Sequence, residues 1–568
     1  MDQYRENVSR QYDPVDIAKH YRLRPWKSIW RGLTIFWFFS GFILGLFWDK
    51  WRSVENKNQR ASQLRRILTS LGPTFIKVGQ SLSTRPDLVR KDYLEELIKL
   101  QDQLPAFDQD LAIAVMREEL GKEIDEIFSE ITPQPIAAAS LGQVYKARLH
   151  NGQEVAVKVQ RPHLLPILSL DLYLMRWAST WMAPILPLNI GHNLTVILDE
   201  FGVKLFEEID YINEGRNAEK FAANFIDDPT VKVPTVYWEY SSQHVLTLEW
   251  INGFKLTDTE SVIAAGLDID DLIRVGVVGG LRQLLEFGFF HADPHPGNLF
   301  ALADGRMAYI DFGMMDQLQE HTKETLVDAV VHLINKDYTE LARDFVKLGF
   351  LTPDTDITPI VPALEAVWGN VFGESVRDFN FRTITDKFSE LVYDYPFRVP
   401  AQFALIIRSL VTEEGLALCL NPDFKIVDVA YPYIAKRLLQ GESPELRRRL
   451  IEVLFKDNKF QWQRLENLIA IAQTDGNFDL IPTAQLGLQF LMSQEGEYLR
   501  KQLILALVED DRLHTEEVAR LWELIQDELH PSRLLNVAWS AITEFSTARM
   551  SNLLPTVGSL TNVNRFNN

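Results

Sequence analysis

The first regular pattern of apolar positions lies between residues 57 and 134, and it has the helical period. Leu64, Ile67, Leu68 and Leu71 recur at spacings that place them on one face of a helix. A Gly-Pro pair ends that helix, and further amphipathic stretches follow without strand-like alternation. The pattern therefore predicts a wholly helical segment over 57–134.

The period changes to two after this segment. SLGQVYKARL and QEVAVKVQ alternate as strands do, and His-Asn-Gly joins them in a sequence typical of a hairpin. A helical block over 163–226 precedes two more strand-like stretches, VPTVYWEY and HVLTLEWI. Helices are predicted over 258–288, a loop with two short strands over 289–312, and amphipathic helices from about 318 to 550. The mixture predicts an α+β protein.

An uncharged apolar run of 17 residues extends from Gly32 to Trp48. At helical rise it is about 26 Å long, close to the hydrocarbon thickness of a bilayer. Three interpretations stay open: a membrane-spanning helix, a helix in the membrane plane, and a buried helix of a soluble protein. Residues 1–66 carry 13 Lys and Arg against 6 Asp and Glu, a local charge of +7. This excess favours an anionic lipid surface as partner, with a solvated arm as the alternative.

Composition narrows the function classes. The net charge of −20 argues against a nucleic-acid-binding protein, because such proteins carry a basic face. Cys419 is the single cysteine, so an intramolecular disulfide and a cysteine metal cluster are excluded. Because Cys419 lies in the apolar run LALCL, we expect it to be an inert core residue.

Five polar positions follow one another in the order found in protein kinases. Lys158 ends the strand-like V-A-V-K, and His291, Asp293 and Asn298 match the H-x-D-x-x-x-x-N spacing of a kinase catalytic loop. Asp311 begins a D-F-G tripeptide 18 positions after Asp293. Each piece alone has an ordinary structural explanation, such as an edge-strand lysine or a turn. Their combination in this order predicts a phosphoryl-transfer site.

The chemistry of phosphoryl transfer assigns these residues their roles. Lys158 would neutralise the α- and β-phosphates of ATP, and Asn298 and Asp311 would offer hard oxygen ligands to Mg²⁺. Asp293 would orient or deprotonate the acceptor, which is a hydroxyl or a water. We expect His291 to brace the loop rather than to take part in chemistry.

The loop before the lysine strand is rich in alanine. In kinase register Ala137, Ala139 and Gly142 stand at the three glycine positions, and Val144 closes the pattern. Methyl groups there should raise and stiffen the loop over the phosphates. No A-P-E segment follows Gly313, which favours a small-molecule, lipid or water acceptor over a protein hydroxyl.

Further motifs resemble the UbiB-type atypical kinase family, also called the aarF-domain kinases. FIKVGQSLSTRPDLV is similar to its K-x-G-Q motif at Lys77 and Gln80, which the resemblance places as a lid beside the nucleotide. EEIDYINEGRN is similar to its E-x-D helix at Glu208 and Asp210, with Glu214 as the acidic partner of the strand lysine. The alanine-rich loop and HADPHPGN also match this family.

The resemblance implies a bilobal protein-kinase-like fold, with a small β-rich N-lobe, a helical C-lobe, an N-terminal helical extension and a helical C-terminal region. It also implies ATP or ADP and Mg²⁺ as cofactors, and LTLEWINGFKL resembles the hinge that faces the base. The nucleotide-binding residues that it implies are Ala137, Ala138, Ala139, Ser140, Gly142, Val144, Lys158, Glu249, Lys77, Gln80, Glu208, Asp210 and Glu214.

In function, the resemblance implies an atypical kinase or ATPase that supports prenyl-quinone metabolism, such as that of plastoquinone, ubiquinone or tocopherol. The expected partners are a nucleotide, a prenyl-lipid or quinone-type molecule, quinone-biosynthesis proteins and a membrane surface. The active site should face the cytoplasm or a stroma-like compartment, and the oligomeric state does not follow from the sequence. A nucleotide-gated scaffold or lipid chaperone, and a phosphotransferase of the aminoglycoside or choline-kinase type, remain alternatives.

The predicted domain organisation has five parts. They are a basic arm with its apolar segment (1–56), the helical extension (57–134), the N-lobe with a helical insertion (135–255), the C-lobe (256–435) and a C-terminal helical region (436–568).

Overall fold

The computed structural model describes the greater part of the chain up to residue 440. The described ranges are 9–52, 57–83, 91–100, 106–182, 194–334, 336–368 and 397–440, with isolated positions outside them. The chain divides into two compact units, one made of 1–327, 342–373 and 379–424, the other of 328–341, 374–378 and 425–568. Every predicted site residue belongs to the first unit, so the site can be described within it.

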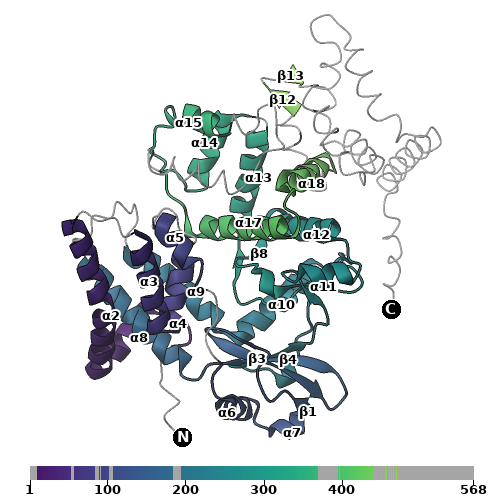
Figure 1. The fold of residues 1–568 in the computed structure, drawn as a ribbon. Coiled ribbons are helices and arrows are strands. Elements are labelled where there is room, and N and C mark those ends of the chain that lie inside the picture. The colour runs from purple at the N-terminus through teal and green to yellow at the C-terminus, as the bar shows by residue number, and fades with distance from the viewer. Residues whose placement is uncertain are drawn as a thin grey trace, which may run out of the picture. The chain divides into compact units, whose positions relative to one another are not determined.

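The first unit begins with a group of helices (Figure 1). They are α1 (Pro14–Arg22), α2 (Pro25–Arg52), α3 (Lys57–Leu71), α4 (Pro73–Ser83) and α5 (Lys91–Leu97). One buried cluster joins α2 to α3, α4 and α5 and includes Phe42, Leu68, Leu71 and Phe75. The apolar face predicted on α3 is therefore the face that packs against its neighbours.

A five-stranded antiparallel sheet follows. Two helices, α6 (Gln109–Leu120) and α7 (Ile124–Ile127), precede the sheet in the chain. Its strands are β1 (Phe128–Ile131), β2 (Ala137–Ala138), β3 (Gly142–Leu149), β4 (Glu154–Gln160) and β6 (Val245–Glu249). The strand order is β1-β3-β4-β6, with β2 paired to β3. The prediction that 57–134 is wholly helical is wrong at its end, because β1 pairs with β3 there. Its few residues show no clear alternation, and the pairing decides their conformation.

A helical region separates the hairpin from β6. It contains α8 (Leu164–Met182), α9 (Leu194–Glu208) and α10 (Tyr211–Asn224), followed by β5 (Val231–Lys232) and the short helix η2 (Trp238–Tyr240). Helices thus lie where the helical block over 163–226 was predicted. Leu168 and Leu172 of α8 are buried with Leu205 and Phe206 of α9 and with residues of α1.

The remaining elements of the first part of the chain are mostly short. They are β7 (Phe254–Lys255), α11 (Thr259–Ala264), α12 (Ile269–Arg282), η3 (Gln283–Phe287), β8 (Phe289–His291), η4 (Pro296–Asn298), β9 (Leu299–Ala301), β10 (Met307–Tyr309) and β11 (Met315–Gln317). The loop 289–312 contains three short strands instead of the predicted two. One four-stranded sheet has the order β5-β10-β9-β7, and β11 pairs with β8.

Helices follow β11, as predicted, up to residue 440, and most of the predicted helical region beyond it lies outside the described residues. These helices are α13 (Glu320–Ile334), α14 (Tyr338–Lys347), α15 (Ile360–Trp368), α17 (Ala401–Leu420) and α18 (Ile426–Gln440). A two-stranded hairpin, β12 (Phe455–Lys456) and β13 (Lys459–Phe460), interrupts the helical pattern of the second unit. Cys419 lies exposed on α17, so its predicted place in a core is wrong; the apolar run LALCL includes one helix position that faces outward.

Candidate functional site

Strand β4 presents its lysine through simple alternation. Val155, Val157 and Val159 are fully buried in a cluster with Met116 of α6. Successive side chains of a strand point to opposite faces of the sheet, so Lys158 lies on the face away from that core. This face lines a cavity of about 660 Å³.

Helix α10 supplies the partner of the lysine. Its N-cap is Asp210, whose carboxylate accepts hydrogen bonds from the backbone N–H groups of Ile212 and Asn213. One turn into the helix, Glu214 is buried, and both its carboxylate oxygens accept from Lys158 Nζ at 2.7 and 2.8 Å. The cap thus fixes the helix that carries the acidic partner expected for Lys158.

The aspartate of D-F-G meets the same ammonium group. Asp311 Oδ2 lies 3.8 Å from Lys158 Nζ, and Asp311 Oδ1 accepts from the backbone N–H of Gly313 at 3.0 Å. Burial disfavours the charged carboxylate, but Lys158 and the Gly313 N–H outweigh it and lower the pKa of Asp311 to about 2. Burial likewise disfavours the charged form of Lys158, yet Asp311 and Glu214 raise its pKa. Lysine and aspartate are therefore both charged at neutral pH.

Glu214 is affected in the opposite direction. Its burial raises its pKa to about 7, although Lys158 favours the ionised form. The bidentate contact with Lys158 is the arrangement of an ionised carboxylate. The pair is consequently sensitive to protonation near neutrality.

The catalytic-loop histidine holds the loop together. The buried His291 accepts from the backbone N–H of Asp293 through Nδ1 at 3.0 Å and donates to the carbonyl oxygen of Asp311 through Nε2 at 2.9 Å. Burial lowers its pKa, which keeps the ring neutral. This geometry is that of the predicted brace. Asn298, from η4, donates to Asp311 Oδ2 at 3.4 Å, so the amide and the carboxylate meet at one edge of the cavity.

An arginine that the sequence motifs did not indicate contacts the catalytic-loop aspartate. Arg408 of α17 forms an ion pair with Asp293 through Nη2 and Oδ2, and its side chain is 14% exposed. The only sequence signal is an arginine in the otherwise apolar run FALIIRSLV. Such a position on a buried helix calls for a buried anion nearby, but the sequence does not say which one.

The alanine-rich loop is a tight strand turn. Ala137 and Ala138 pair with Val144 and Gln143, and the Ala139 N–H donates to the Gly142 carbonyl oxygen at 2.8 Å. Positive φ outside glycine occurs in the described chain only at His163 and Lys336, so this loop does not need glycine for its backbone.

Two further contacts explain which loop positions tolerate a side chain. A Cβ at Gly142 would lie 2.7 Å from the Val159 carbonyl oxygen and also overlap the Tyr211 hydroxyl, so this position must be glycine. Arg161 Nε and Nη2 both donate to the Ala139 carbonyl oxygen at 3.3 Å. This clamp, which the sequence analysis did not include, fixes the loop.

The large cavity gathers most of the predicted site residues. Those that line it are Lys77, Ala137, Ala138, Ala139, Ser140, Gly142, Val144, Lys158, Glu208, Glu249, Asn298 and Asp311. The carboxylate of Glu249 is engaged with Lys232 and Thr235. Asp210 and Glu214 support the cavity wall from helix α10 without lining it.

Helix α4 carries the K-x-G-Q residues to the other side of this cavity. Lys77 is buried and forms an ion pair with Glu208 at the end of α9. Gly79 allows α4 to pack closely, because a Cβ there would overlap Leu100. Gln80 donates through Nε2 to the Leu100 carbonyl oxygen at 2.8 Å. The motif thus fixes α4 against α9 and the end of the α5 segment.

A second cavity of about 350 Å³ adjoins the first and shares Lys77 and Glu208 with it. Arg408 and Gln80 also line it. Its apolar lining comes from α4, α9, α17 and the residue after D-F-G, and consists of Leu82, Ile197, Phe201, Val203, Leu205, Met314, Ala404 and Leu405. The ion pair between Lys77 and Glu208 therefore lies where the two cavities meet.

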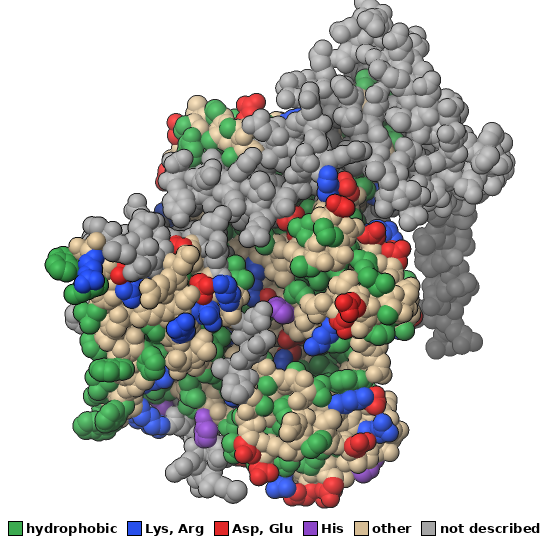
Figure 2. All heavy atoms as spheres, in the orientation of Figure 1, with side chains coloured by type: hydrophobic (Ala, Val, Ile, Leu, Met, Phe, Trp, Pro, Cys, Tyr) green, Lys and Arg blue, Asp and Glu red, His purple; other side chains and the backbone are tan. Residues whose placement is uncertain are grey.

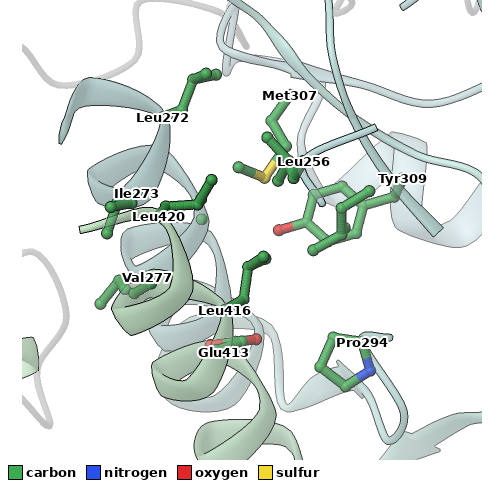
Figure 3. Close-up of a pocket in the computed structure, with 13 residues that line it drawn as sticks. Leu256, Leu272, Ile273, Val277, Pro294, Met307, Tyr309, Glu413, Leu416 and Leu420 are labelled. Carbon is green, nitrogen blue, oxygen red and sulfur yellow. The ribbon is translucent and has the colours of Figure 1, made fainter. Parts of the chain in front are cut away.

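A third, very small cavity of about 20 Å³ lies between α12 and α17 (Figure 3). Leucines and Met307 surround it, together with Tyr309 and Pro294 of the catalytic loop. The carboxylate of Glu413 points into it, and Oε2 has no hydrogen-bond partner among the described residues. The space holds at most one water molecule, so this cavity is a packing feature.

Comparisons with known proteins agree with this geometry. The family described as the ABC1 atypical kinase-like domain matches residues 99–345, and the UbiB helical domain matches residues 364–425. An uncharacterized protein of Synechocystis sp., slr1919, is 68% identical over 96% of this chain and 97% of its own length. The chain belongs to the ABC1/UbiB atypical kinase family. The predicted family and the α+β kinase-like fold with N-terminal helices and a helical C-terminal region are confirmed.

Other relatives include a plant protein and a solved structure. Protein ACTIVITY OF BC1 COMPLEX KINASE 1, chloroplastic, of Arabidopsis thaliana is 49% identical over 88% of this chain and 76% of its own length. The Rv3197–erythromycin complex of Mycobacterium tuberculosis is 26% identical, covers 62% of this chain and 90% of that one, and has a TM-score of 0.45. The chain is thus related to chloroplastic ABC1 kinases.

Proposed function

We propose that the chain is a membrane-associated, Mg²⁺-dependent atypical kinase or ATPase that binds ATP and ADP and supports prenyl-quinone lipid metabolism. The observation that carries the proposal is that the carboxylates of Glu214 and Asp311 both face the ammonium group of Lys158. Lys158 and Asp311 line a cavity of about 660 Å³. This volume is within the range of small-molecule sites.

The donor set fits a magnesium ion. Asn298 and Asp311 meet at the cavity edge and offer an amide and a carboxylate, which with phosphate oxygens suit Mg²⁺. The Asn298 amide has to turn its oxygen toward the ion. When bound, the metal supplies charge neutralisation at the phosphates, and Lys158 adds its own positive charge beside it.

The reaction assigned to the site is phosphoryl transfer. The acceptor oxygen forms a bond to the γ-phosphorus, the bond to the β–γ bridging oxygen breaks, and ADP leaves. Asp293 receives the proton of the acceptor hydroxyl or water. The second cavity is lined by apolar side chains together with charged ones such as Glu200, Lys204 and Arg408, and Arg408 pairs with Asp293; this mixed lining suits an acceptor with an apolar body and a hydroxyl head. The prenyl-quinone class rests on the family resemblance and on this lining.

The chain after D-F-G supports a non-protein acceptor. β11 begins at Met315 and pairs with β8, and α13 begins at Glu320. Only a few residues separate D-F-G from helix α13, and they are held in a strand, so no peptide-docking loop is present in this described segment.

Nucleotide turnover by purified protein with lipid and Mg²⁺-ATP tests the catalytic part. Asp311→Asn should lower turnover at least about 100-fold, because it removes the charge that faces the metal and Lys158. Asp304→Asn is the matched control, since Asp304 is exposed and pairs only locally with Arg306. Turnover that survives Asp311→Asn would contradict the proposal.

The pathway is tested in cells. A deletion strain that loses a particular quinone or tocopherol from its lipid extract identifies the lipid class. Asp293→Asn should fail to restore that lipid; restoration by this variant would instead favour a nucleotide-gated scaffold over a transferase.

A further inference from the structure

Helix α2 has an exposed aromatic face along its whole length. The side chains of this face recur at intervals of three, four and seven positions, and each is more than half exposed; we call them the α2 stripe: Trp26, Trp30, Leu33, Trp37, Leu44, Trp48 and Trp51. Figure 2 shows hydrophobic side chains gathered along the edge of the molecule where Figure 1 draws α2.

The opposite face of α2 is held against the protein. Phe42 is buried among residues of α3, α4 and α5, with Ile35 and Phe39 packed beside it. Arg31 donates to both carboxylate oxygens of Asp171 on α8 at 2.7 and 2.8 Å, and Asp171 is completely buried. α2 is therefore fixed against helices of the helical extension and against α8.

Helix α3 returns along α2 in the opposite direction. At one end Arg60 pairs with Asp49 at 2.5 and 3.0 Å and donates to the Gly45 carbonyl oxygen. At the other end Arg31 donates to the Leu71 carbonyl oxygen at 2.6 Å. If α2 crossed a bilayer in this packing, α3 would have to lie in the hydrocarbon beside it with its arginines and polar face, which is costly.

By length and composition alone α2 is able to span a membrane, since Pro25–Asp49 is long and apolar enough. The distribution of tryptophan favours a different placement. Tryptophan prefers the membrane–water interface, so a spanning helix carries it at both ends. Trp37 lies near the middle of α2, on the same face as the terminal tryptophans. A helix parallel to the membrane keeps all of them at interfacial depth.

Charge indicates which surface is contacted. Exposed Arg22, Arg24 and Lys27 precede or begin α2, and Arg52 ends it with its guanidinium over the Trp48 ring. Residues 1–66 have a charge of +7, whereas the complete chain has −20. An anionic lipid surface attracts this region and repels the rest of the chain.

We infer that α2 is a monotopic anchor, which lies in the plane of one leaflet of an anionic lipid surface and buries the α2 stripe there without crossing the bilayer. The inference specifies how the proposed membrane association is made. It leaves the nucleotide chemistry independent, because no residue of α2 lines the nucleotide cavity.

The first experiment determines topology with the full chain. Lys27→Cys and Arg52→Cys are made separately in a Cys419→Ala background and reconstituted from detergent into sealed vesicles of phosphatidylcholine and phosphatidylglycerol. A membrane-impermeant maleimide should label both positions as completely as it does after detergent is added again. Protection of either end until detergent is added would show a spanning helix and overturn the inference, while membrane association itself would stand.

A probe in the middle of α2 measures depth. Gly41 is exposed, and a Cβ there would meet nothing within 4 Å, so Gly41→Cys accepts an environment-sensitive fluorophore. Quenchers placed near the head groups should reduce its emission more than quenchers near the bilayer centre. The opposite order would overturn the inference.

Matched variants test the α2 stripe. Trp37→Glu with Leu44→Glu should lower binding to these vesicles at least about tenfold, because charged side chains replace apolar ones that the lipid would bury. Ile226→Glu with Ile263→Glu makes the same charge change at exposed apolar positions elsewhere and should bind as wild type does. If wild-type protein binds no vesicles, both the association and the anchor are wrong, and the stripe is covered by protein. ATP turnover, measured in parallel, shows whether the catalytic proposal survives.

Discussion

Arg408 brings a positive charge to Asp293 from a helix that begins more than 100 positions later. A guanidinium there orients the Asp293 carboxylate, and in the proposed reaction it would place a cation near the transferred phosphoryl group. Its place in the second cavity also brings it to the acceptor side of the site.

We expect Arg408→Gln to lower ATP turnover by about 10- to 100-fold while nucleotide affinity changes little, because the lost interaction acts on the transferred group. Arg408→Lys should retain part of the activity. Steady-state kinetics and ADP titrations separate the two effects, and Arg398→Gln, at a nearby exposed position, is the control. A rise in turnover would mean that Arg408 restrains the site instead.

Glu413 is a buried carboxyl whose burial raises its pKa to about 8. The unfolded chain releases this proton near pH 4.5, whereas the folded chain keeps it until about pH 8. Because the folded state binds this proton and the unfolded state does not, the contribution of Glu413 to the free energy of unfolding falls as the pH rises from about 4.5 to about 8. The fall is at most about 1.4 kcal/mol per pH unit.

Glu413→Gln removes this dependence without changing the shape of the side chain. The variant should melt higher than wild type at pH 8 and close to it at pH 5. Thermal unfolding across this range checks the difference, with the exposed Glu260→Gln as control. An equal shift in melting temperature at both pH values would show that Glu413 does not titrate there.

At the scale of elements, the alanine-rich loop is a short hairpin whose position depends on three contacts. β2 pairs with β3, the Ala139 N–H reaches Gly142, and Arg161 holds the Ala139 carbonyl oxygen. The loop gives up glycine where its backbone does not need it and keeps glycine at Gly142, where a side chain would overlap β4.

Ala139→Gly should therefore raise ATP affinity relative to ADP several-fold, since it loosens the loop and lets it approach the phosphates. Gly142→Ala should have the opposite effect and weaken both nucleotides. Competition titrations with ATP and ADP measure the ratio. An unchanged preference in Ala139→Gly would sink the explanation that methyl groups restrain this loop.

At the scale of the whole first unit, the helical extension contacts the nucleotide cavity through one buried ion pair. Lys77 on α4 and Glu208 on α9 line both the nucleotide cavity and its apolar neighbour. The contact makes the K-x-G-Q helix a wall of the site, which suits a lid between nucleotide and acceptor.

A double-mutant cycle with Lys77→Met and Glu208→Gln measures this coupling. Each single variant removes this ion pair and should destabilise the fold, and the pair should show a coupling energy of about 2 kcal/mol in denaturant unfolding. The matched surface cycle is Arg274→Met with Asp271→Asn, an exposed pair within α12 for which we expect a far smaller coupling. Additive effects of Lys77→Met and Glu208→Gln would show that this ion pair does not couple α4 to α9.

The sequence by itself determined the family and the α+β kinase-like class, and it supplied the site residues on which the proposed chemistry rests, because short motifs with fixed spacing carry them. The alternating pattern predicted the strand that carries Lys158, and Asp293, Asn298 and Asp311 stood at kinase spacings. Strand β1 was missed, since its pairing with β3 rather than its own pattern makes it a strand. The exposure of Cys419 was missed for a similar reason: an apolar run does not show which helix face looks outward.

Only the tertiary structure decided which distant groups meet. The ion pair of Arg408 with Asp293 and the clamp of Arg161 on the alanine loop depend on packing between elements that local sequence does not encode. The apolar helix near the N-terminus is the clearest case. Its composition left spanning, in-plane and buried placements open, and our inference of the in-plane placement rests on contacts that only the structure shows, those of Arg31 with Asp171 and of Arg60 with Asp49.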